Sequence, residues 1–376
     1  MTGKAGIIGL GLIGGSLAKA LKVKCGYTRI SAVNRSLAPL EQARKEGVVD
    51  DFAVESGLSG DTLRDLFGDC EVIFLCAPVD RIPGYAERLI GVIQPECILT
   101  DVGSTKMSIN QYMASKSPVC FIGGHPMAGS EKTGYNNAVH YLFENAFYIL
   151  APMPWVPETA VCKLIQIIGR LGAIPMRMTP AAHDAAVAAV SHAPHVIASA
   201  LVNSVQSLDI SGDLHALAAG GFKDLTRIAS SNPEIWQAIS LENRVELLNA
   251  LRSFMDKLKL FTEYLDNKDS EAISRFFAGA RAYRDSFANI SAGAYNRRFE
   301  LRVQVEDKPG IIATVATILS FNGINIKNIG ILNSREYENG IMLIVFDDET
   351  ALRNSSQLLK RMNFIVFDET GTGANQ

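Results

Sequence analysis

His125 lies in the glycine-rich segment Gly123–Lys132, directly after a short apolar run that predicts a strand. Ligands of open α/β sheets bind at the carboxyl ends of the strands. An imidazole has an ordinary pKa of about 6.5, which suits it to accept a proton from a hydroxyl near neutral pH. Taken alone, His125 fits a structural loop histidine equally well.

Further polar residues lie in segments with a helical pattern. Ser191 and His195 are four residues apart, so both can face one cavity, and Pro194 between them predicts a local irregularity. His192 and His195 also suit a metal ion, but no third ligand has a convincing spacing, and we expect no metal. Arg227 is an isolated charge in a helical region, and a guanidinium matches the geometry of a substrate carboxylate.

A glycine loop follows the first predicted strand and opens the helix Gly15–Lys22. In this setting the pattern G-x-G-x-x-G predicts a dinucleotide-binding loop, because glycines let backbone N–H groups approach a pyrophosphate at the positive end of a helix. A glycine turn that only packs strand on helix is the alternative. The candidate cofactor-binding residues of the loop are Gly9, Gly11, Leu12, Ile13 and Gly14.

The end of the second predicted strand bears on which nicotinamide coenzyme binds. An NAD enzyme usually has Asp or Glu here, whereas this chain has Asn34, Arg35 and Ser36. Asn34 can bond a ribose hydroxyl, and Arg35 and Ser36 suit a 2′-phosphate by charge and hydrogen bonding, which favours NADP over NAD. Arg35 as a solvated loop charge is the alternative.

Seven short apolar runs alternate with helical patterns over the first half of the chain. They predict strands at Ala5–Ile8, Arg29–Val33, Val72–Cys76, Ile98–Val102, Val119–Ile122, Phe147–Ala151 and Ile174–Met178. Strands separated by crossover helices form a parallel sheet. We expect an α/β Rossmann-like doubly wound parallel sheet, in a dinucleotide-binding domain over residues 1–178.

Two further patterns follow. Ala181–Gln206 and Pro233–Tyr264 are periodic at i, i+3 and i+4 and too apolar for single helices to bury alone, so we expect an all-helical substrate and dimerisation domain over residues 179–296, and a homodimer. From Phe299 onwards, alternating β-branched residues predict strands and helices in the order βαββαβ, a ferredoxin-like domain over residues 297–370. The polar segment Gly371–Gln376 is expected to be disordered.

Composition narrows the class of partner. The formal net charge is −3 and the chain has no Lys/Arg block, which argues against nucleic acid or a membrane surface and favours a small-molecule substrate. The six cysteines form no C-x-x-C pair, so we expect reduced thiols, no disulfides and no zinc. We find no targeting segment and no span of about 20 uncharged apolar residues, and expect a cytoplasmic protein.

Taken together, these segments resemble the prephenate and arogenate dehydrogenase family from residue 4 to about residue 290. The resemblance rests on the glycine loop, D-x-G-S-x-K, G-G-H-P-M-A-G-S-E-K, S-H-x-P-H, G-F-K-D-x-T-R-I-A and P-x-x-W, in the family's order. Asn34 departs from the pattern, because many members have Asp there.

The resemblance implies roles for individual residues. By this resemblance, His125 would accept the proton of the ring hydroxyl, and Ser104 would hydrogen-bond near it. Ser191 and His195 would line the substrate pocket, and Arg227 would hold a substrate carboxylate. Glu131 would lie at the pocket entrance and Trp236 near the dimer contact. Simpler accounts are a helix N-cap for Ser104, a core position for His192, helix packing for Trp236 and a surface charge for Glu131.

The implied chemistry is an oxidative decarboxylation. While His125 polarises the C4 hydroxyl, hydride leaves C4 for the nicotinamide and the ring carboxylate departs as CO2, giving an aromatic product. Residues 299–370 are also similar to an ACT domain, whose signature here includes Asp307–Gly310 and Ile324–Ile326. That similarity implies an amino-acid effector, with tyrosine as the candidate, or a domain that only aids dimerisation.

Several alternatives stay open from sequence. Arogenate differs from prephenate by an amine in place of a keto group, and Glu131 is the one candidate to meet that amine. A 3-hydroxyacid or phosphogluconate-type dehydrogenase would share the fold plan but relies on a catalytic lysine in its helical domain. A cofactor-binding amino-acid sensor without activity is the non-enzymatic alternative.

Overall fold

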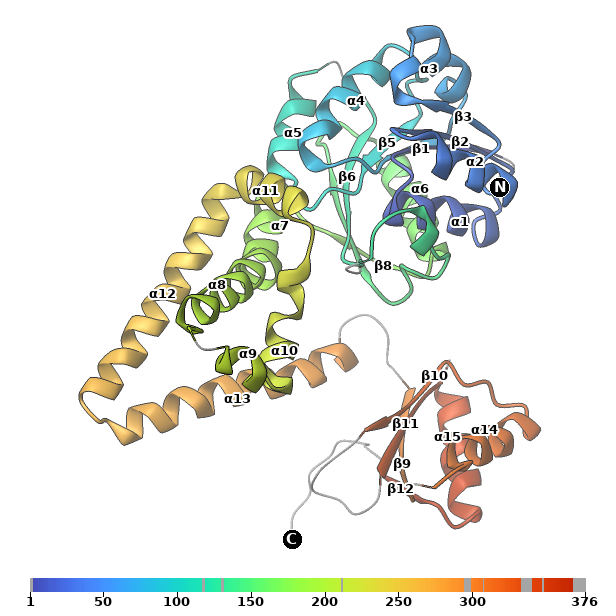
Figure 1. The fold of residues 1–376 in the computed structure, drawn as a ribbon. Helices are drawn as coiled ribbons and strands as arrows, with labels where there is room; N and C mark the ends of the chain where they lie inside the picture. Colours follow the sequence, from blue (N-terminus) through green and yellow to red (C-terminus); the bar gives the residue numbers. More distant parts are fainter. Residues whose placement is uncertain are drawn as a thin grey trace. The chain divides into compact units, whose positions relative to one another are not determined.

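The computed structural model describes residues 3–116, 119–129, 132–210, 212–293, 299–306, 308–332, 340–346 and 348–367. The chain divides into two compact units, Met1–Leu260 and Phe261–Gln376. The first unit holds a large sheet and most of the following helices, and the second holds the small C-terminal sheet (Figure 1).

The large sheet has eight strands in the order β3-β2-β1-β4-β5-β6-β7-β8. Their bounds are β1 Lys4–Ile8, β2 Arg29–Asn34, β3 Asp51–Val54, β4 Val72–Leu75, β5 Ile98–Asp101, β6 Phe121–Pro126, β7 Phe147–Pro152 and β8 Ile174–Arg177. All seven predicted strands are confirmed, within a few residues at their ends. The sequence pattern missed β3, a half-exposed edge strand whose polar start hides its period.

Helices cover both faces of this sheet, as a doubly wound fold requires. On one face α1 (Leu12–Val23), α2 (Leu37–Lys45) and α6 (Glu158–Arg170) pack on alternate strand residues such as Ile7 and Phe74. On the other face α3 (Gly60–Phe67), α4 (Ile82–Ile90) and α5 (Met107–Ala114) pack on their neighbours, such as Ile8 and Leu75. This alternation explains why the strands are apolar on both sides.

The sheet is not parallel throughout. β1 to β6 run parallel, but β7 pairs with β6 in the antiparallel sense, and β8 is parallel to β7. Between β6 and β7 the described chain forms only the short 3₁₀ turn Tyr135–Asn137, so no crossover helix returns it to the opposite edge. The expectation of a parallel sheet therefore holds for six strands, and the last two are reversed.

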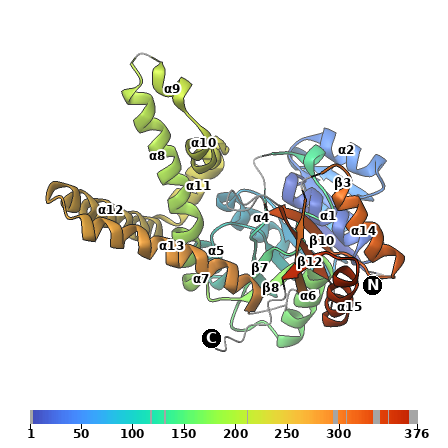
Figure 2. The same cartoon turned by 90° about the horizontal axis from the view of Figure 1, so that it is seen from below.

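The middle of the chain is helical over its described residues, as predicted. Its elements are α7 Pro180–Val187, the π-helical turn Ala188–His192, α8 Ala193–Leu208, α9 Asp213–Leu217, α10 Gly220–Thr226, the 3₁₀ turn Arg227–Ser230, α11 Pro233–Glu242, α12 Arg244–Asp266 and α13 Ser270–Gly293. The π turn directly before Pro194 confirms the predicted irregularity, because a proline removes a backbone donor and crowds the preceding turn. Figure 2 shows α8 leading away from the sheet, with α9 at its far end.

Among the described residues, Pro180–Leu208 is long and apolar enough to span a membrane by length and composition, with a mean hydropathy of 1.6. It is more apolar than the sequence pattern led us to expect. However, its buried His183 and Asp184 hydrogen-bond to residues of the sheet domain. These bonds make it a structural element of the first unit.

From Phe299 onwards, the second unit confirms the order βαββαβ. The elements of this part are β9 Phe299–Val305, α14 Ile311–Phe321, β10 Asn328–Leu332, β11 Gly340–Phe346, α15 Glu349–Arg361 and β12 Ile365–Phe367, with the antiparallel strand order β10-β11-β9-β12. Alternate residues of β9 and β11 pack against Val315, Leu319 and Leu359 of the two helices. Gly310 precedes α14 with a φ of 88°, whereas Asp307 of the predicted turn and the tail 371–376 lie outside the described residues.

Candidate active site

One cavity of about 650 Å³ in the first unit brings together most of the residues selected from sequence. It is lined by Gly11, Leu12, Ile13, Gly14, Ser104, His125, Ser191, His195 and Arg227, and also by Cys76, Lys132, His192 and Trp236. Gly9, Asn34, Arg35 and Ser36 are not among its lining residues, and Glu131 lies outside the described residues. The glycine loop, the ends of β5 and β6, and the helical segment thus face one space.

The glycines of the loop have different structural reasons. Gly9 has a φ of 94°, and a Cβ there would lie 2.4 Å from the backbone oxygen of Cys76. A Cβ on Gly14 would lie 1.9 Å from the backbone oxygen of Gly9. A Cβ on Gly11, in contrast, would meet no atom within 4 Å, although Gly11 lines the cavity. Packing explains Gly9 and Gly14, and the open space beside Gly11 leaves room for a ligand.

The position of this space fits a dinucleotide. Gly11 is the N-cap of α1, so the cavity meets the positive end of that helix, and the first turn of α1 carries no acidic residue. Backbone N–H groups at such an end are suited to a pyrophosphate. The residues present therefore fit a nicotinamide dinucleotide at Gly11, Leu12 and Ile13.

Asn34 has a structural duty that the sequence did not reveal. Its Oδ1 accepts a hydrogen bond from the backbone N–H of Leu10 at 3.0 Å, and its Nδ2 donates to the backbone oxygen of Ser36 at 3.0 Å. The side chain thereby ties the glycine loop to the end of β2. Arg35 and Ser36 are exposed just before α2.

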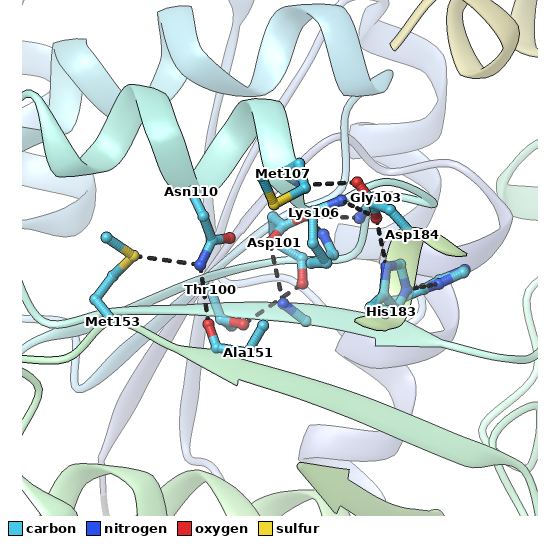
Figure 3. Close-up of polar contacts among 12 residues, drawn as sticks. Thr100, Asp101, Gly103, Lys106, Met107, Asn110, Ala151, Met153, His183 and Asp184 are labelled. Carbon is cyan, nitrogen blue, oxygen red and sulfur yellow. Dashed lines mark hydrogen bonds and ion pairs between the residues drawn. The ribbon is translucent and has the colours of Figure 1, made fainter. Parts of the chain in front are cut away.

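A fully buried ion pair joins Asp101, at the end of β5, to Nζ of Lys106. Asp101 also accepts hydrogen bonds from the backbone N–H of Gly103 at 2.8 Å and of Gly124 at 3.0 Å, so it ties the loop after β5 to strand β6 (Figure 3). Burial lowers the pKa of Lys106, and the charge of Asp101 opposes that shift. Asp101 and Lys106 are the first and last residues of the motif D-x-G-S-x-K, whose pattern suggested no role for either.

His125 is buried, with 9% of its surface exposed, and it is held from the helical segment. Its Nδ1 lies 2.8 Å from Nε2 of His183, and Nδ1 of His183 lies 2.7 Å from Oδ1 of Asp184. The carboxylate of Asp184 accepts from the backbone N–H groups of Lys106 at 2.7 Å and Met107 at 2.8 Å, at the start of α5. Asp184 therefore caps α5, and the N-cap reading of Ser104 was wrong.

The electrostatics of the site favour a neutral His125. Burial lowers its pKa well below the ordinary value, and the neighbouring His183, Lys106 and His192 lower it further. A neutral imidazole at neutral pH is the form that accepts a proton.

Part of the cavity lining is aromatic. The ring of His195 stacks on Trp236 with centroids 3.7 Å apart, and burial lowers the pKa of His195. His192 is buried, and its Nδ1 accepts from Nδ2 of Asn243 at 3.1 Å; burial lowers its pKa to about 4. Both histidines are thus neutral groups at neutral pH, and Trp236 lines the cavity as well as packing its helix.

Besides Asp101 and Lys106, the sequence assigned no role to His183, Asp184, Asn243 and Lys132. One signal was available for His183 and Asp184, because they form a lone polar pair within the run Ala181–Val190, which otherwise contains only Ala and Val. A buried charge in such a run needs a partner. Asn243 interrupts a helical pattern without a comparable signal.

Comparisons with known proteins agree along the chain. Residues 17–175 match the family described as "Prephenate dehydrogenase, nucleotide-binding domain", residues 179–279 match "Prephenate dehydrogenase, dimerization domain", and residues 301–366 match "AHAS small subunit-like ACT domain". The prephenate dehydrogenase of Bacillus subtilis (strain 168) is 36% identical over 358 residues, which are 94% of this chain and 95% of that relative.

Two solved structures are similar to the same part of the chain. The prephenate dehydrogenase of A. aeolicus, in complex with hydroxyphenyl propionate and NAD+, superposes with a TM-score of 0.71 at 27% identity, over 76% of this chain and 99% of that one. The arogenate dehydrogenase of Synechocystis superposes with a TM-score of 0.64 at 32% identity, also over 76% and 99%.

The glycine loop allows a matched pair of substitutions. Gly9→Ala places a Cβ against backbone at a positive φ, and we expect it to lower the free energy of unfolding by about 1–3 kcal/mol. Gly11→Ala meets no protein atom, so it should leave stability unchanged but weaken coenzyme binding. Thermal unfolding and coenzyme titration by fluorescence measure the two effects. Equal coenzyme affinity in the Gly11 variant and the unaltered protein would contradict this assignment.

Proposed function

Because this chain belongs to the prephenate dehydrogenase family, we propose that it catalyses the oxidative decarboxylation of prephenate to 4-hydroxyphenylpyruvate with NAD(P) in tyrosine biosynthesis. The observation that carries the proposal is the single cavity in which the glycine loop, His125 and Arg227 meet. A coenzyme, a proton acceptor and a carboxylate partner are the groups this reaction needs in one place.

In the reaction His125 is the acceptor for the C4 hydroxyl of the substrate. The nicotinamide ring, when bound, supplies the acceptor for the hydride that leaves C4. The ring carboxylate departs as CO2, and its bonding electrons complete the aromatic ring. His125 holds the hydroxyl proton while charge develops and returns it to the phenol oxygen, so the enzyme gains no proton.

The remaining cavity residues orient the substrate. Arg227 holds a substrate carboxylate by charge-assisted hydrogen bonds, while Ser104, which lines the same cavity as His125, bonds near the hydroxyl. Ser191 and the stacked pair of His195 and Trp236 line the same cavity as the glycine loop. Orientation of this kind accounts for a large part of enzymatic rate enhancement. Glu131, proposed at the entrance, is the candidate to meet the amine of arogenate.

Finer features of the enzyme belong to the same proposal. The coenzyme is NADP in preference to NAD, bound through Arg35 and Ser36. The chain works as a cytoplasmic homodimer through its helical domain over residues 179–296, next to a coenzyme domain over residues 1–178. The ACT domain over residues 297–370 binds an amino acid, with tyrosine as the end product that inhibits; the match of residues 301–366 to an ACT family supports a regulatory role.

Nicotinamide reduction tests the function directly. Purified protein is assayed with prephenate or arogenate, each with NAD or NADP, with and without tyrosine. We expect turnover with prephenate, faster with NADP, and slower when tyrosine is present. Faster turnover with arogenate would reassign the substrate, and absence of turnover in all four combinations would overturn the proposal.

Two variants should separate proton transfer from binding. His125→Asn should lower kcat by about 10²–10⁴-fold with little change in KM, because it removes the proton acceptor. Arg227→Met should raise the KM for prephenate by about 10–100-fold, the equivalent of losing about 1.5–3 kcal/mol of charge-assisted hydrogen bonding. Arg64→Met, on the exposed face of α3, is the control and should leave both constants unchanged.

The same lowered pKa sets the pH dependence. Catalysis needs neutral His125, so kcat/KM is retained at neutral pH and lost as pH falls through a pKa below the ordinary value. A loss of activity already at pH 7 would contradict a neutral His125.

Coenzyme preference depends on the end of β2. Asn34→Asp retains an oxygen for the N–H of Leu10 but adds a negative charge near the proposed 2′-phosphate site. We expect kcat/KM for NADP to fall about tenfold or more by charge repulsion, with a smaller change for NAD. The ratio of kcat/KM for the two coenzymes measures this effect, and an unchanged ratio would remove Arg35 and Ser36 from the coenzyme site.

A further inference from the structure

The chain of contacts behind His125 begins with a carboxylate whose partners are all donors. Oδ1 of Asp184 accepts from the N–H of Lys106, and Oδ2 accepts from the N–H of Met107. Asp184 is 2% exposed and lies at the positive end of α5 (Figure 3). A carboxylate in this setting is held as an anion, since a proton on it would face a backbone N–H.

The anion determines where the next proton lies. Because Oδ1 of Asp184 is an acceptor, Nδ1 of His183 carries a hydrogen and donates it over 2.7 Å. Nε2 of a neutral His183 then has a lone pair, so Nδ1 of His125 must donate over the 2.8 Å contact between them. His125 is left with a lone pair on Nε2.

From this geometry we propose that His183 and Asp184 are positioning residues that select the Nδ1–H tautomer of His125, so that Nε2 is the atom that accepts the substrate proton. This inference rests on the proposed function, in which His125 is the proton acceptor. Neither His183 nor Asp184 is among the residues that line the cavity, so both act through His125.

The opposite tautomer is disfavoured by burial. It would place a hydrogen on Nε2 of His183, and that ring would then be either a cation or unable to donate to Asp184. His183 is fully buried, and a buried polar atom without its partner is costly. The resulting bias favours the useful tautomer over the other by about 5- to 150-fold.

The same chain stabilises the charge that appears during the reaction. As the hydroxyl donates to Nε2, positive charge develops on the His125 ring, and the negative charge of Asp184 offsets it through His183. The other groups that face His125 are Lys106, paired with Asp101, and His192, which is neutral. Asp184 therefore supplies the negative charge that stabilises the cation.

The tautomer can be observed without turnover. The full chain, labelled with ¹⁵N-histidine, has six histidines, and His125→Asn identifies the signals of His125. At neutral pH we expect a protonated Nδ1 and an unprotonated Nε2 for His125. Asp184→Asn offers an amide that can donate to Nδ1 of His183, and should move the His125 ring towards the Nε2–H form. A protonated Nε2 in the unaltered protein would overturn the proposal.

Kinetics then test the consequence. His183→Leu, which leaves the cap on α5 in place, and Asp184→Asn should each lower kcat by about 10²–10⁴-fold while KM for prephenate changes little. Asp184→Asn should also move the acidic limb of kcat/KM to lower pH, because an anion that favours the His125 cation is lost. His140→Leu, at an exposed position, is the matched control and should retain full activity.

These experiments distinguish failure of the positioning role from failure of the proposed function. An active His125→Asn variant would sink the proposed function. An inactive His125→Asn variant beside fully active His183 and Asp184 variants would sink the positioning role alone. Thermal unfolding of each variant identifies a loss of fold, and the tautomer measurement on the unaltered protein stands whether or not a variant folds.

Discussion

Asp101 ends β5 inside the protein, and its buried carboxylate holds three groups in place. It pairs with Lys106, and it accepts hydrogen bonds from the backbone N–H groups of Gly103, in the loop after β5, and of Gly124, in β6. A buried charge tolerates the loss of its partner poorly, at a cost of about 3–5 kcal/mol. The pair therefore fixes the loop that carries Ser104 and the strand end that carries His125 in one arrangement.

Asp184 connects this arrangement to the helical segment. It receives the two N–H groups at the start of α5, directly after the lysine that pairs with Asp101. Two anions, Asp101 and Asp184, and one cation, Lys106, are thus buried in the part of the fold that holds His125. Backbone N–H groups and His183 donate the remaining hydrogen bonds to the two carboxylates. In the proposed reaction positive charge develops on His125, and the negative charge of Asp184, relayed through His183, is what would stabilise it.

Much of the fold followed from local pattern. Seven strands and the βαββαβ unit were visible as periods of apolar residues, and the glycine loop as the spacing G-x-G-x-x-G. The i, i+4 spacing predicted that Ser191 and His195 face one cavity, and both line it. The direction of β7 could not be predicted from the sequence, because side chains alternate in the same way in parallel and antiparallel strands. The edge strand β3 was missed because half-exposed residues weaken its period.

The sequence predicted site residues that line the cavity, but not the residues that hold them in place from behind. His183 contacts His125 across 58 positions of sequence, and no spacing rule links them. Asn34 was interpreted through the coenzyme, whereas its amide oxygen bonds Leu10 and holds the glycine loop. Such hydrogen-bond partners are distant in sequence and meet only in the folded chain. The one sequence signal for them is a polar residue within an otherwise apolar run.

The cap that Asp184 places on α5 also bears on how this enzyme is divided into modules. The coenzyme-binding part contains the glycine loop and His125, but the residues that orient His125 come after position 178, in the first turns of the helical part. A chimaera that joins the coenzyme-binding part of one distant relative to the helical part of another would preserve both folds. It would still lose the contacts of His183 and Asp184 with His125 and α5. An active chimaera would therefore need residues 180–192 from the same parent protein as its Rossmann domain.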